Sequence, residues 1–156
     1  SIDGYFTHMP GVYIVYPSNA ADAKALLKTA CRVNDPVLFL EHKGIYRQKY
    51  SSMDEPDENT FLGFGKGRYV SSGKDITIIS WGAIIQKSVE AARNLNVSAD
   101  IIDLRTLCPL DMDIIEESIS KTNRVVINTG KKSPKYFDKY PKIEPKSGKK
   151  IAAYSI

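Results

Sequence analysis

Cysteine, histidine and long apolar runs are all scarce in this sequence. Its 156 residues include 2 Cys and 2 His. Cys31 and Cys108 lie far apart, with no Cys-X-X-Cys pair and no histidine at ligand spacing, which excludes a disulfide framework and a recognisable zinc or redox motif. The longest apolar runs, residues 37–40 and 75–81, are much shorter than the roughly 20 residues that cross a membrane, so we expect no membrane-spanning segment.

The formal charge of +4 is concentrated at the C-terminal end. Residues 129–156 hold eight Lys against Asp138 and Glu144, a surplus of +6, which leaves −2 on residues 1–128. A lysine-rich segment with interspersed prolines is typical of a solvated tail, so we do not expect a nucleic-acid partner. A tail that contacts an acidic partner stays open as an alternative.

Strand-like and helix-like segments alternate along the rest of the chain. Strands are predicted over residues 12–16, 37–40, 76–80, 99–104 and 125–127, and helices over residues 18–31, 83–94 and 111–121. In the first helix the apolar spacing predicts a buried stripe of Ala23, Leu26, Leu27, Ala30 and Cys31. The continuous apolar run at 37–40 is typical of a strand that is buried on both faces of a parallel sheet.

This alternation predicts an α/β fold with parallel sheets and strand-helix-strand crossovers, in two partial units. Residues 49–73 have no clear period, contain Gly63, Gly65 and Gly67, and are too long for a loop inside a compact domain, so they are interpreted as a linker. The expected organisation is a first unit at 1–48, a linker at 49–73, a second unit at 74–128 and a lysine-rich tail at 129–156.

Few residues carry recognisable chemistry. The Gly-Phe-Gly-Lys-Gly-Arg run at 63–68 lacks the frame of a phosphate-binding loop and is interpreted as a set of turns. His42 and Glu41 follow a predicted strand at the edge where α/β proteins bind ligands, and His8 has no evident partner. Glu41 and Asp103 are carboxylates at predicted strand ends, and Arg105 follows Asp103 by two residues. An ion pair or loop-fixing hydrogen bonds is their expected role.

Several blocks together resemble the β subunit of thiamine-diphosphate-dependent 2-oxo acid dehydrogenases, the first component for pyruvate or branched-chain 2-oxo acids. The blocks are Tyr-Phe-Thr-His-Met-Pro-Gly-Val at 5–12, Tyr-Pro-Ser-Asn-Ala-Ala-Asp-Ala at 16–23, Asn-Asp-Pro-Val-Leu-Phe-Leu-Glu-His-Lys at 34–43 and Ile-Ile-Asp-Leu-Arg-Thr-Leu at 101–107. The resemblance runs to about residue 127. It implies a transketolase-like fold, with 1–48 closing the pyrimidine-binding domain and 74–128 opening the C-terminal domain.

The resemblance also implies what this chain does not carry. The cofactor-activating carboxylate, the stacking aromatic residue and the active-site histidine of the family precede Ser1, so no catalytic or cofactor-binding residue is assigned. We expect a part of a longer protein that is inactive alone. The parent enzyme would use thiamine diphosphate and magnesium, with an α subunit, a second β subunit and a dihydrolipoyl acyltransferase core as partners, in a bacterial cytoplasm or a mitochondrial matrix.

One family site does fall inside the chain. The resemblance places a structural potassium ion at the turn after the first helix, with Ala30, Cys31, Val33 and Asp35 at the matching positions. Val33 stands where the family usually has Asp, and Cys31 where it often has Ile. Backbone carbonyl oxygens would still suit a hard cation.

Two alternatives stay open. One is a non-catalytic interaction module that uses the basic tail, and the other is the transketolase or deoxyxylulose-phosphate synthase branch of the same fold. After Asn128 the resemblance ends, and residues 151–156 are a candidate strand that would cover a bare sheet edge.

Overall fold

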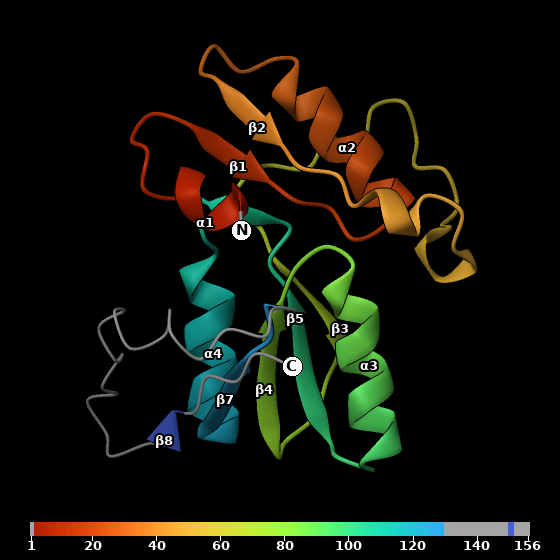
Figure 1. The fold of residues 1–156 in the computed structure, drawn as a ribbon, viewed down its shortest axis with the longest axis vertical. Coiled ribbons are helices and arrows are strands. Elements are labelled where there is room, and N and C mark those ends of the chain that lie inside the picture. The colour runs from red at the N-terminus through yellow and green to blue at the C-terminus, as the bar shows by residue number, and fades with distance from the viewer. Residues whose placement is uncertain (1, 130–149, 152–156) are drawn as a thin grey trace. The chain divides into compact units, whose positions relative to one another are not determined.

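The computed structural model describes residues 2–129 and 150–151, which fall into two compact units (Figure 1). Unit 1 contains residues 1–68, 81–83 and 104–111, and unit 2 contains residues 69–80, 84–103 and 112–156. Apart from Thr129, Lys150 and Ile151, the predicted tail lies outside the described residues. No helix in the described ranges is long and apolar enough to cross a membrane.

Unit 1 is a small mixed sheet with one long helix. Its elements are α1 (Ile2–Phe6), β1 (Tyr13–Val15), α2 (Ala20–Ala30), β2 (Val37–Phe39), the short 3-10 helices η1 (Lys43–Ile45) and η2 (Lys49–Ser51), and β6 (Thr106–Cys108). The strand order is β2-β1-β6. β1 and β2 are parallel, joined through α2 as the alternation predicts, and Ile14, Val15 and Leu26 form the fully buried centre.

β6 is the element of unit 1 that departs most from the sequence prediction. It pairs antiparallel with β1, with Ile14 opposite Cys108 and Val15 opposite Thr106. A three-residue strand beside Pro109 has too little apolar pattern to be recognised from sequence. Cys108 therefore lies in a strand and not in a loop.

The buried side of α2 also differs from the prediction. Asn19 caps the helix, since its Oδ1 accepts a hydrogen bond from the Asp22 amide at 2.9 Å. The buried residues of the helix are Asp22, Ala25 and Leu26, whereas Leu27 and Cys31 are exposed, so the predicted stripe is wrong in part. The reason is that Asp22 turns inward to meet arginine side chains described below.

Residues 37–40 were expected to form a strand buried on both faces, but β2 is only half-buried. It is an edge strand of the described sheet, paired with β1 alone. An edge position leaves one side of a strand uncovered, which explains the intermediate exposure of Val37, Leu38 and Phe39.

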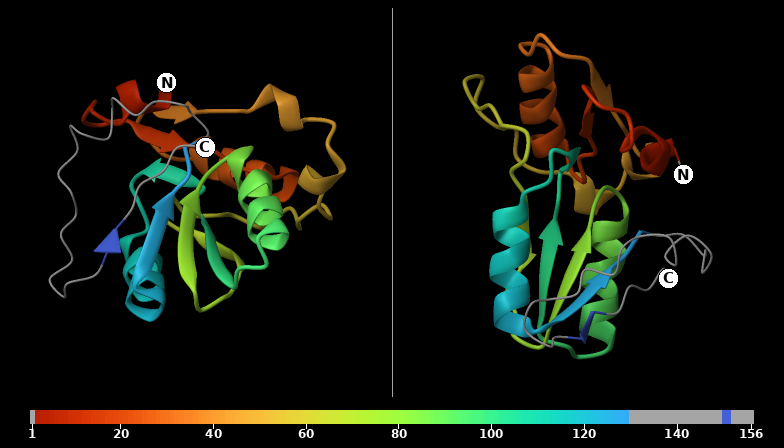
Figure 2. Two further views of the ribbon diagram at one scale, coloured as in Figure 1. Left: turned by 60° about the horizontal axis from the view of Figure 1, so that its bottom comes forward. Right: turned by 90° about the vertical axis from the view of Figure 1, so that its left-hand side faces the viewer.

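Unit 2 is an open sheet with helices on both faces. Its elements are β3 (Arg68–Ser71), β4 (Ile76–Ser80), α3 (Ile84–Asn94), β5 (Ala99–Asp103), α4 (Met112–Thr122), β7 (Arg124–Ile127) and β8 (Lys150–Ile151), in the order β3-β5-β4-β7-β8. The strands β5, β4, β7 and β8 are parallel, and α3 and α4 cover opposite faces (Figure 2). These crossovers confirm the α/β fold.

Three details of unit 2 extend the prediction. All five residues of the central strand β5 are buried, as expected for a parallel strand covered on both faces. β3 lies inside the segment 49–73 that was interpreted as a linker. β8 pairs with β7, Val125 opposite Ile151, so the expectation that residues 151–156 cover an edge holds for Ile151, and residues 152–156 lie outside the described ranges.

A buried polar network fixes β5 against α4. The Asp100 side chain is fully buried and accepts hydrogen bonds from Lys121 Nζ, Ser118 Oγ and the Gly73 amide, each at 2.7 Å. Gly73 is required here because a Cβ would lie 2.3 Å from the Ser98 carbonyl carbon. Burial raises the pKa of Asp100, but the Lys121, Gly73 and Ser118 hydrogen bonds together outweigh burial, and the pKa lies below its usual value.

Replacing this carboxylate should destabilise unit 2. Asp100→Asn is expected to lower the free energy of unfolding by about 2 kcal/mol, because hydrogen bonds to a buried charged acceptor are replaced by weaker ones to a neutral amide. Because the folded pKa is depressed, the stabilisation is present above the unfolded pKa of about 3.9 and is lost as the pH falls through the folded value. Urea unfolding at neutral and acidic pH measures both effects.

The control is Glu116→Gln, an exposed carboxylate on α4, the helix that carries Ser118 and Lys121, and it should leave unfolding unchanged. Equal stability of Asp100→Asn and wild type at neutral pH would contradict the role of the network.

Candidate functional site

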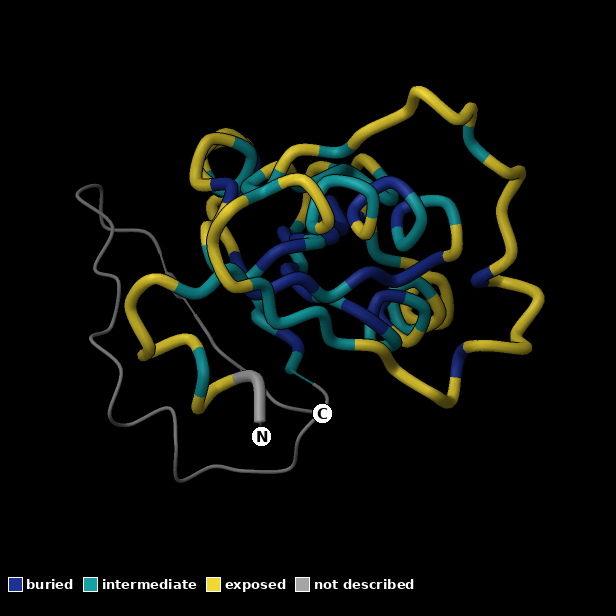
Figure 3. The backbone as a smooth tube through the Cα atoms, turned by 90° about the horizontal axis from the view of Figure 1, so that it is seen from above, coloured by how far each residue is buried: buried dark blue, intermediate teal, exposed yellow. Residues whose placement is uncertain are grey.

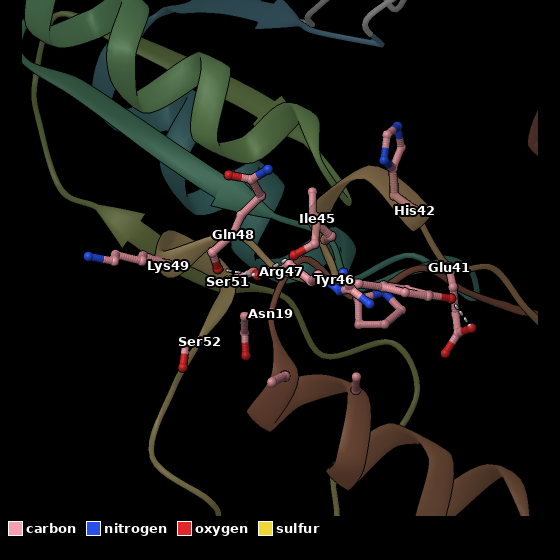
Figure 4. Close-up of a pocket in the computed structure, with 13 residues that line it drawn as sticks. Asn19, Glu41, His42, Ile45, Tyr46, Arg47, Gln48, Lys49, Ser51 and Ser52 are labelled. Carbon is pink, nitrogen blue, oxygen red and sulfur yellow. Dashed lines mark hydrogen bonds between the residues drawn. The ribbon is translucent and has the colours of Figure 1, made fainter.

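The candidate site is a cavity of about 530 Å³ in unit 1. It opens where the chain leaves β1 and β2 at their carboxyl ends and where α2 begins, the edge at which α/β folds bind ligands. Its walls come from three places: Pro17 after β1, residues 19–23 at the start of α2, and residues 41–52 after β2 (Figure 4).

Residues 41–52 give the cavity its polar character. The Tyr46 hydroxyl donates to Glu41 Oε2 at 2.6 Å, and this hydrogen bond, with burial and the Glu41 charge, raises the pKa of Tyr46. Arg47 and Lys49 add two positive charges to the lining, and His42 stands at the start of η1 (Figure 4). These polar groups line the cavity together with the apolar side chains of Pro17, Ala20 and Ile45.

Residues 41–52 are held by a series of backbone turn hydrogen bonds, among them Ile45 N–H to the His42 carbonyl and Ser51 N–H to the Gln48 carbonyl, each at 3.0 Å. Ser51 Oγ donates to the carbonyls of Ile45 at 2.6 Å and Gln48 at 2.8 Å, so this hydroxyl fixes the loop. Ile45 and Ser51 are the buried residues of 41–61, and the others are mostly exposed (Figure 3). No hydrogen bond between described residues joins His42 to a hydroxyl, thiol or carboxylate, so the geometry shows no assembled nucleophile and base.

A buried cluster of charged side chains lies next to the part of the cavity wall that α2 forms. Asp22 is 8% exposed, and Arg105 donates to both of its oxygens, Nε to Oδ2 at 3.0 Å and NH2 to Oδ1 at 2.7 Å. Arg68 Nε lies 3.2 Å from Asp22 Oδ2. Asn19, which lines the cavity, donates from Nδ2 to Asp22 Oδ2 at 2.6 Å. The cluster therefore links a wall residue to two guanidinium groups.

The backbone conformation of Arg105, which contributes to this cluster, is uncommon. Its φ is +60°, a left-handed conformation that L residues seldom adopt. The sequence predicted an ion pair or loop-fixing hydrogen bonds for Asp103 and Arg105, and Arg105 does form an ion pair, with Asp22, 83 residues earlier. Asp22 was missed as the centre of this cluster, although an acidic residue in the first turn of a capped helix is a weak signal for it.

The glycine-rich run at 63–68 is a structural loop. The Gly65 amide donates to Thr106 Oγ1 and the Gly67 amide donates to Asp111 Oδ2, both at 2.9 Å. Backbone amides that are already bonded cannot cradle a phosphate. His8 lies in an exposed turn after α1, away from the lining residues of the cavity.

The turn expected to hold potassium lies at the end of α2. Ala30 is the last helical residue, Cys31 is the C-cap, and Asp35 is exposed. Among described residues, the carbonyl oxygens of Ala30, Cys31 and Val33 accept no backbone hydrogen bond. Carbonyl and carboxylate oxygens are the donors that a hard cation prefers, and potassium binding at this turn stays a prediction.

Within residues 2–129 and 150–151, no group of three or more His, Cys, Asp or Glu side chains could hold a metal ion.

Comparison with known proteins gives two domain matches in chain order. Residues 3–49 match the transketolase pyrimidine-binding domain, and residues 65–131 match the transketolase C-terminal domain. The chain is 42% identical to the β subunit of acetoin:2,6-dichlorophenolindophenol oxidoreductase from Cupriavidus necator, over 78% of this chain and 36% of that protein.

Two further relatives are dehydrogenase subunits. The chain is 41% identical to the pyruvate dehydrogenase E1 component subunit beta of Bacillus subtilis, over 81% of this chain and 39% of that protein. It is 44% identical to the mitochondrial 2-oxoisovalerate dehydrogenase subunit beta of Dictyostelium discoideum, over 82% of this chain and 35% of that protein. The chain thus spans less than two fifths of the length of these relatives.

Solved structures agree on the fold. An inactive β4 tetramer of a split-gene transketolase superposes with a TM-score of 0.69 at 21% identity, over 97% of this chain and 50% of that chain. The transketolase of Campylobacter jejuni gives 0.60 at 13% identity, over 98% of this chain and 23% of that chain. At these identities the likeness concerns the fold alone.

The Asp22–Arg105 pair should show strong energetic coupling. In a double-mutant cycle with Asp22→Asn and Arg105→Gln, each single change is expected to lower the unfolding free energy by about 2 kcal/mol, because it weakens two charge-assisted hydrogen bonds while Arg68 still lies beside Asp22. The double variant should lose less than the sum. Chemical unfolding of the four proteins measures the coupling.

The matched control is the more exposed pair of Lys24, which also lies on α2, and Glu55. Its Nζ and Oε1 atoms are also 2.7 Å apart, and it should show no measurable coupling. Additive losses for Asp22 and Arg105 would contradict the cluster as a cooperative unit.

Proposed function

Since the chain belongs to the transketolase family, with sequence from its pyrimidine-binding and C-terminal domains, we propose that it forms part of the β subunit of a thiamine-diphosphate-dependent 2-oxo acid dehydrogenase. The observation that carries the proposal is the 41–44% identity to dehydrogenase β subunits through both domains in one order. The parent reaction would be oxidative decarboxylation of pyruvate or a branched-chain 2-oxo acid, with transfer of the acyl group to a lipoyl carrier.

Within that enzyme the chain would supply framework and subunit interface. The buried carboxylates Asp22 and Asp100 both hold cationic partners inside their own units, so they are not available for proton transfer. The domain division at 1–48, 49–73, 74–128 and 129–156 is part of this proposal. The expected partners are an α subunit, a second β subunit and a dihydrolipoyl acyltransferase core.

The dehydrogenase branch is favoured over the transketolase branch. The relatives above 40% identity are dehydrogenase or oxidoreductase β subunits, whereas the transketolase structures share 13–21% identity with the chain. Because the relatives include bacterial proteins and a mitochondrial one, we propose a bacterial cytoplasm or a mitochondrial matrix as the compartment.

Thiamine diphosphate should not bind this chain alone. Titration of the cofactor with magnesium into the purified chain is expected to give no saturable heat, because the resemblance places the family's cofactor residues outside residues 1–156. Calorimetry makes the measurement, and it is repeated after addition of an α subunit. Saturable binding to the chain alone would contradict the upstream position of the cofactor residues, and Glu41 and His42 would then be the first residues to replace.

Potassium should stabilise unit 1 through the turn after α2. We expect a higher melting temperature in potassium than in sodium at equal ionic strength, because a cation that binds only the folded state stabilises it. Asp35→Ala should abolish the difference, and Asp54→Ala, an exposed acidic residue outside the turn, should retain it. Equal melting in both salts would overturn the site at Ala30, Cys31, Val33 and Asp35.

A further inference from the structure

The outward side of α2 combines positive charge with exposed apolar surface. Lys24, Leu27, Lys28 and Cys31 follow the i, i+3, i+4, i+7 spacing, so they share one side of the helix. Leu27 is 50% exposed and Cys31 is exposed as well. We refer to these four residues, with Arg32, as the outer face of α2.

Residues 53–62, which we term the strap, lie along the outer face. Lys24 Nζ donates to Glu55 Oε1 at 2.7 Å and to the Pro56 carbonyl at 3.0 Å, and Lys28 Nζ donates to the Glu58 carbonyl. The Phe61 ring is the apolar anchor of the strap. Its centroid lies 4.7 Å from Lys28 Nζ and 4.5 Å from Arg32 Cζ, so it makes two cation–π contacts.

The strap is held weakly. The Glu55 side chain is 81% exposed and Phe61 is 45% exposed, so water screens both kinds of contact. It contains no helix or strand, only a turn in which the Asn59 amide donates to Asp57 Oδ1 at 2.7 Å. At the end of the strap, the Leu62 amide donates a long hydrogen bond of 3.5 Å to the Ala25 carbonyl. Displacing these contacts costs little.

The carboxylates of the strap are poorly placed to pair with the cations of the outer face. The strap carries four carboxylates, at Asp54, Glu55, Asp57 and Glu58, yet within the described residues only Glu55 forms an ion pair with this face. Lys28 Nζ instead donates a hydrogen bond to the carbonyl oxygen of Glu58. A peptide that places carboxylates on Lys28 and Arg32 would gain charge-assisted hydrogen bonds that the strap does not provide.

We propose that the outer face of α2 is a docking surface for an acidic segment of a partner protein that carries an aromatic residue, and that the strap occupies this surface in the free chain. The partner displaces the strap by offering better-placed carboxylates and an equivalent aromatic ring. This proposal does not depend on the proposed enzymatic function.

The test uses a fluorescent peptide with the sequence of residues 53–61, Met-Asp-Glu-Pro-Asp-Glu-Asn-Thr-Phe, added to the full chain. A variant with a loosened strap, Glu55→Gln with Phe61→Ala, should bind the peptide about tenfold more tightly than wild type. The gain arises because fewer molecules have the surface covered. Fluorescence anisotropy gives both affinities, and circular dichroism verifies the fold of each variant.

Charge-reversal variants identify which lysines bind the peptide. In the loosened background, Lys24→Glu with Lys28→Glu should abolish binding, because both cations are then replaced by like charges. Lys74→Glu with Lys87→Glu makes the same change in charge at exposed lysines of unit 2 and should leave binding intact. A peptide with Ala in place of its Phe should bind several-fold more weakly.

Three results would overturn the proposal. The first is equal affinity in wild type and the loosened variant, when hydrogen exchange shows that residues 53–62 have become less protected. The second is binding that survives reversal of Lys24 and Lys28. The third is an equal loss of binding in the Lys74 and Lys87 control, which would indicate attraction to net charge alone.

Discussion

Burial of the Asp22 carboxylate at the start of α2 is the constraint on which unit 1 depends. A carboxylate that is 8% exposed must have cationic partners, because an unpaired buried charge is far more costly than any gain from packing. Arg105 meets this requirement with two hydrogen bonds, at the expense of a left-handed backbone. Once Arg105 is fixed, Thr106 begins the strand that pairs with β1 and accepts the Gly65 amide. One ion pair therefore determines where residues 104–111 lie and why they belong to unit 1.

Unit 2 also contains a buried carboxylate, and a different set of groups balances its charge. Asp100 is fully buried in the central strand, and its charge is balanced by Lys121 from α4 together with a hydroxyl and a backbone amide. Ser118 and Thr122 also bond to Thr77 at 2.7 Å, so polar groups from β4, β5 and α4 form one satisfied network. A network of this kind is satisfied in only one register of the helix on the sheet. It therefore specifies a single packing arrangement as well as stabilising it.

The regular part of the fold could be predicted from sequence because it depends on local pattern. Apolar runs located all five predicted strands, and helix spacing located α2, α3 and α4. Other elements could not be predicted, since they depend on partners distant in the chain. β6 exists through its pairing with β1, and β3 through its place beside β5. The same limit applies to the site: Glu41 and His42 were located by their position after a strand, whereas Asp22 gains its role from an arginine 83 residues away.

The two sides of α2 explain how one helix can serve both stability and recognition. Its inner side is committed to the fold, because Asp22 is bound by arginine and Leu26 is fully buried. Its outer side contributes little to folding, since the contacts there are exposed ion pairs and cation–π contacts that water weakens. Sequence periodicity assigned Leu27 and Cys31 to the inner side, and their exposure follows from the inward turn of Asp22. The interaction that stabilises unit 1 is thus also the reason that α2 presents lysines and apolar side chains to a partner.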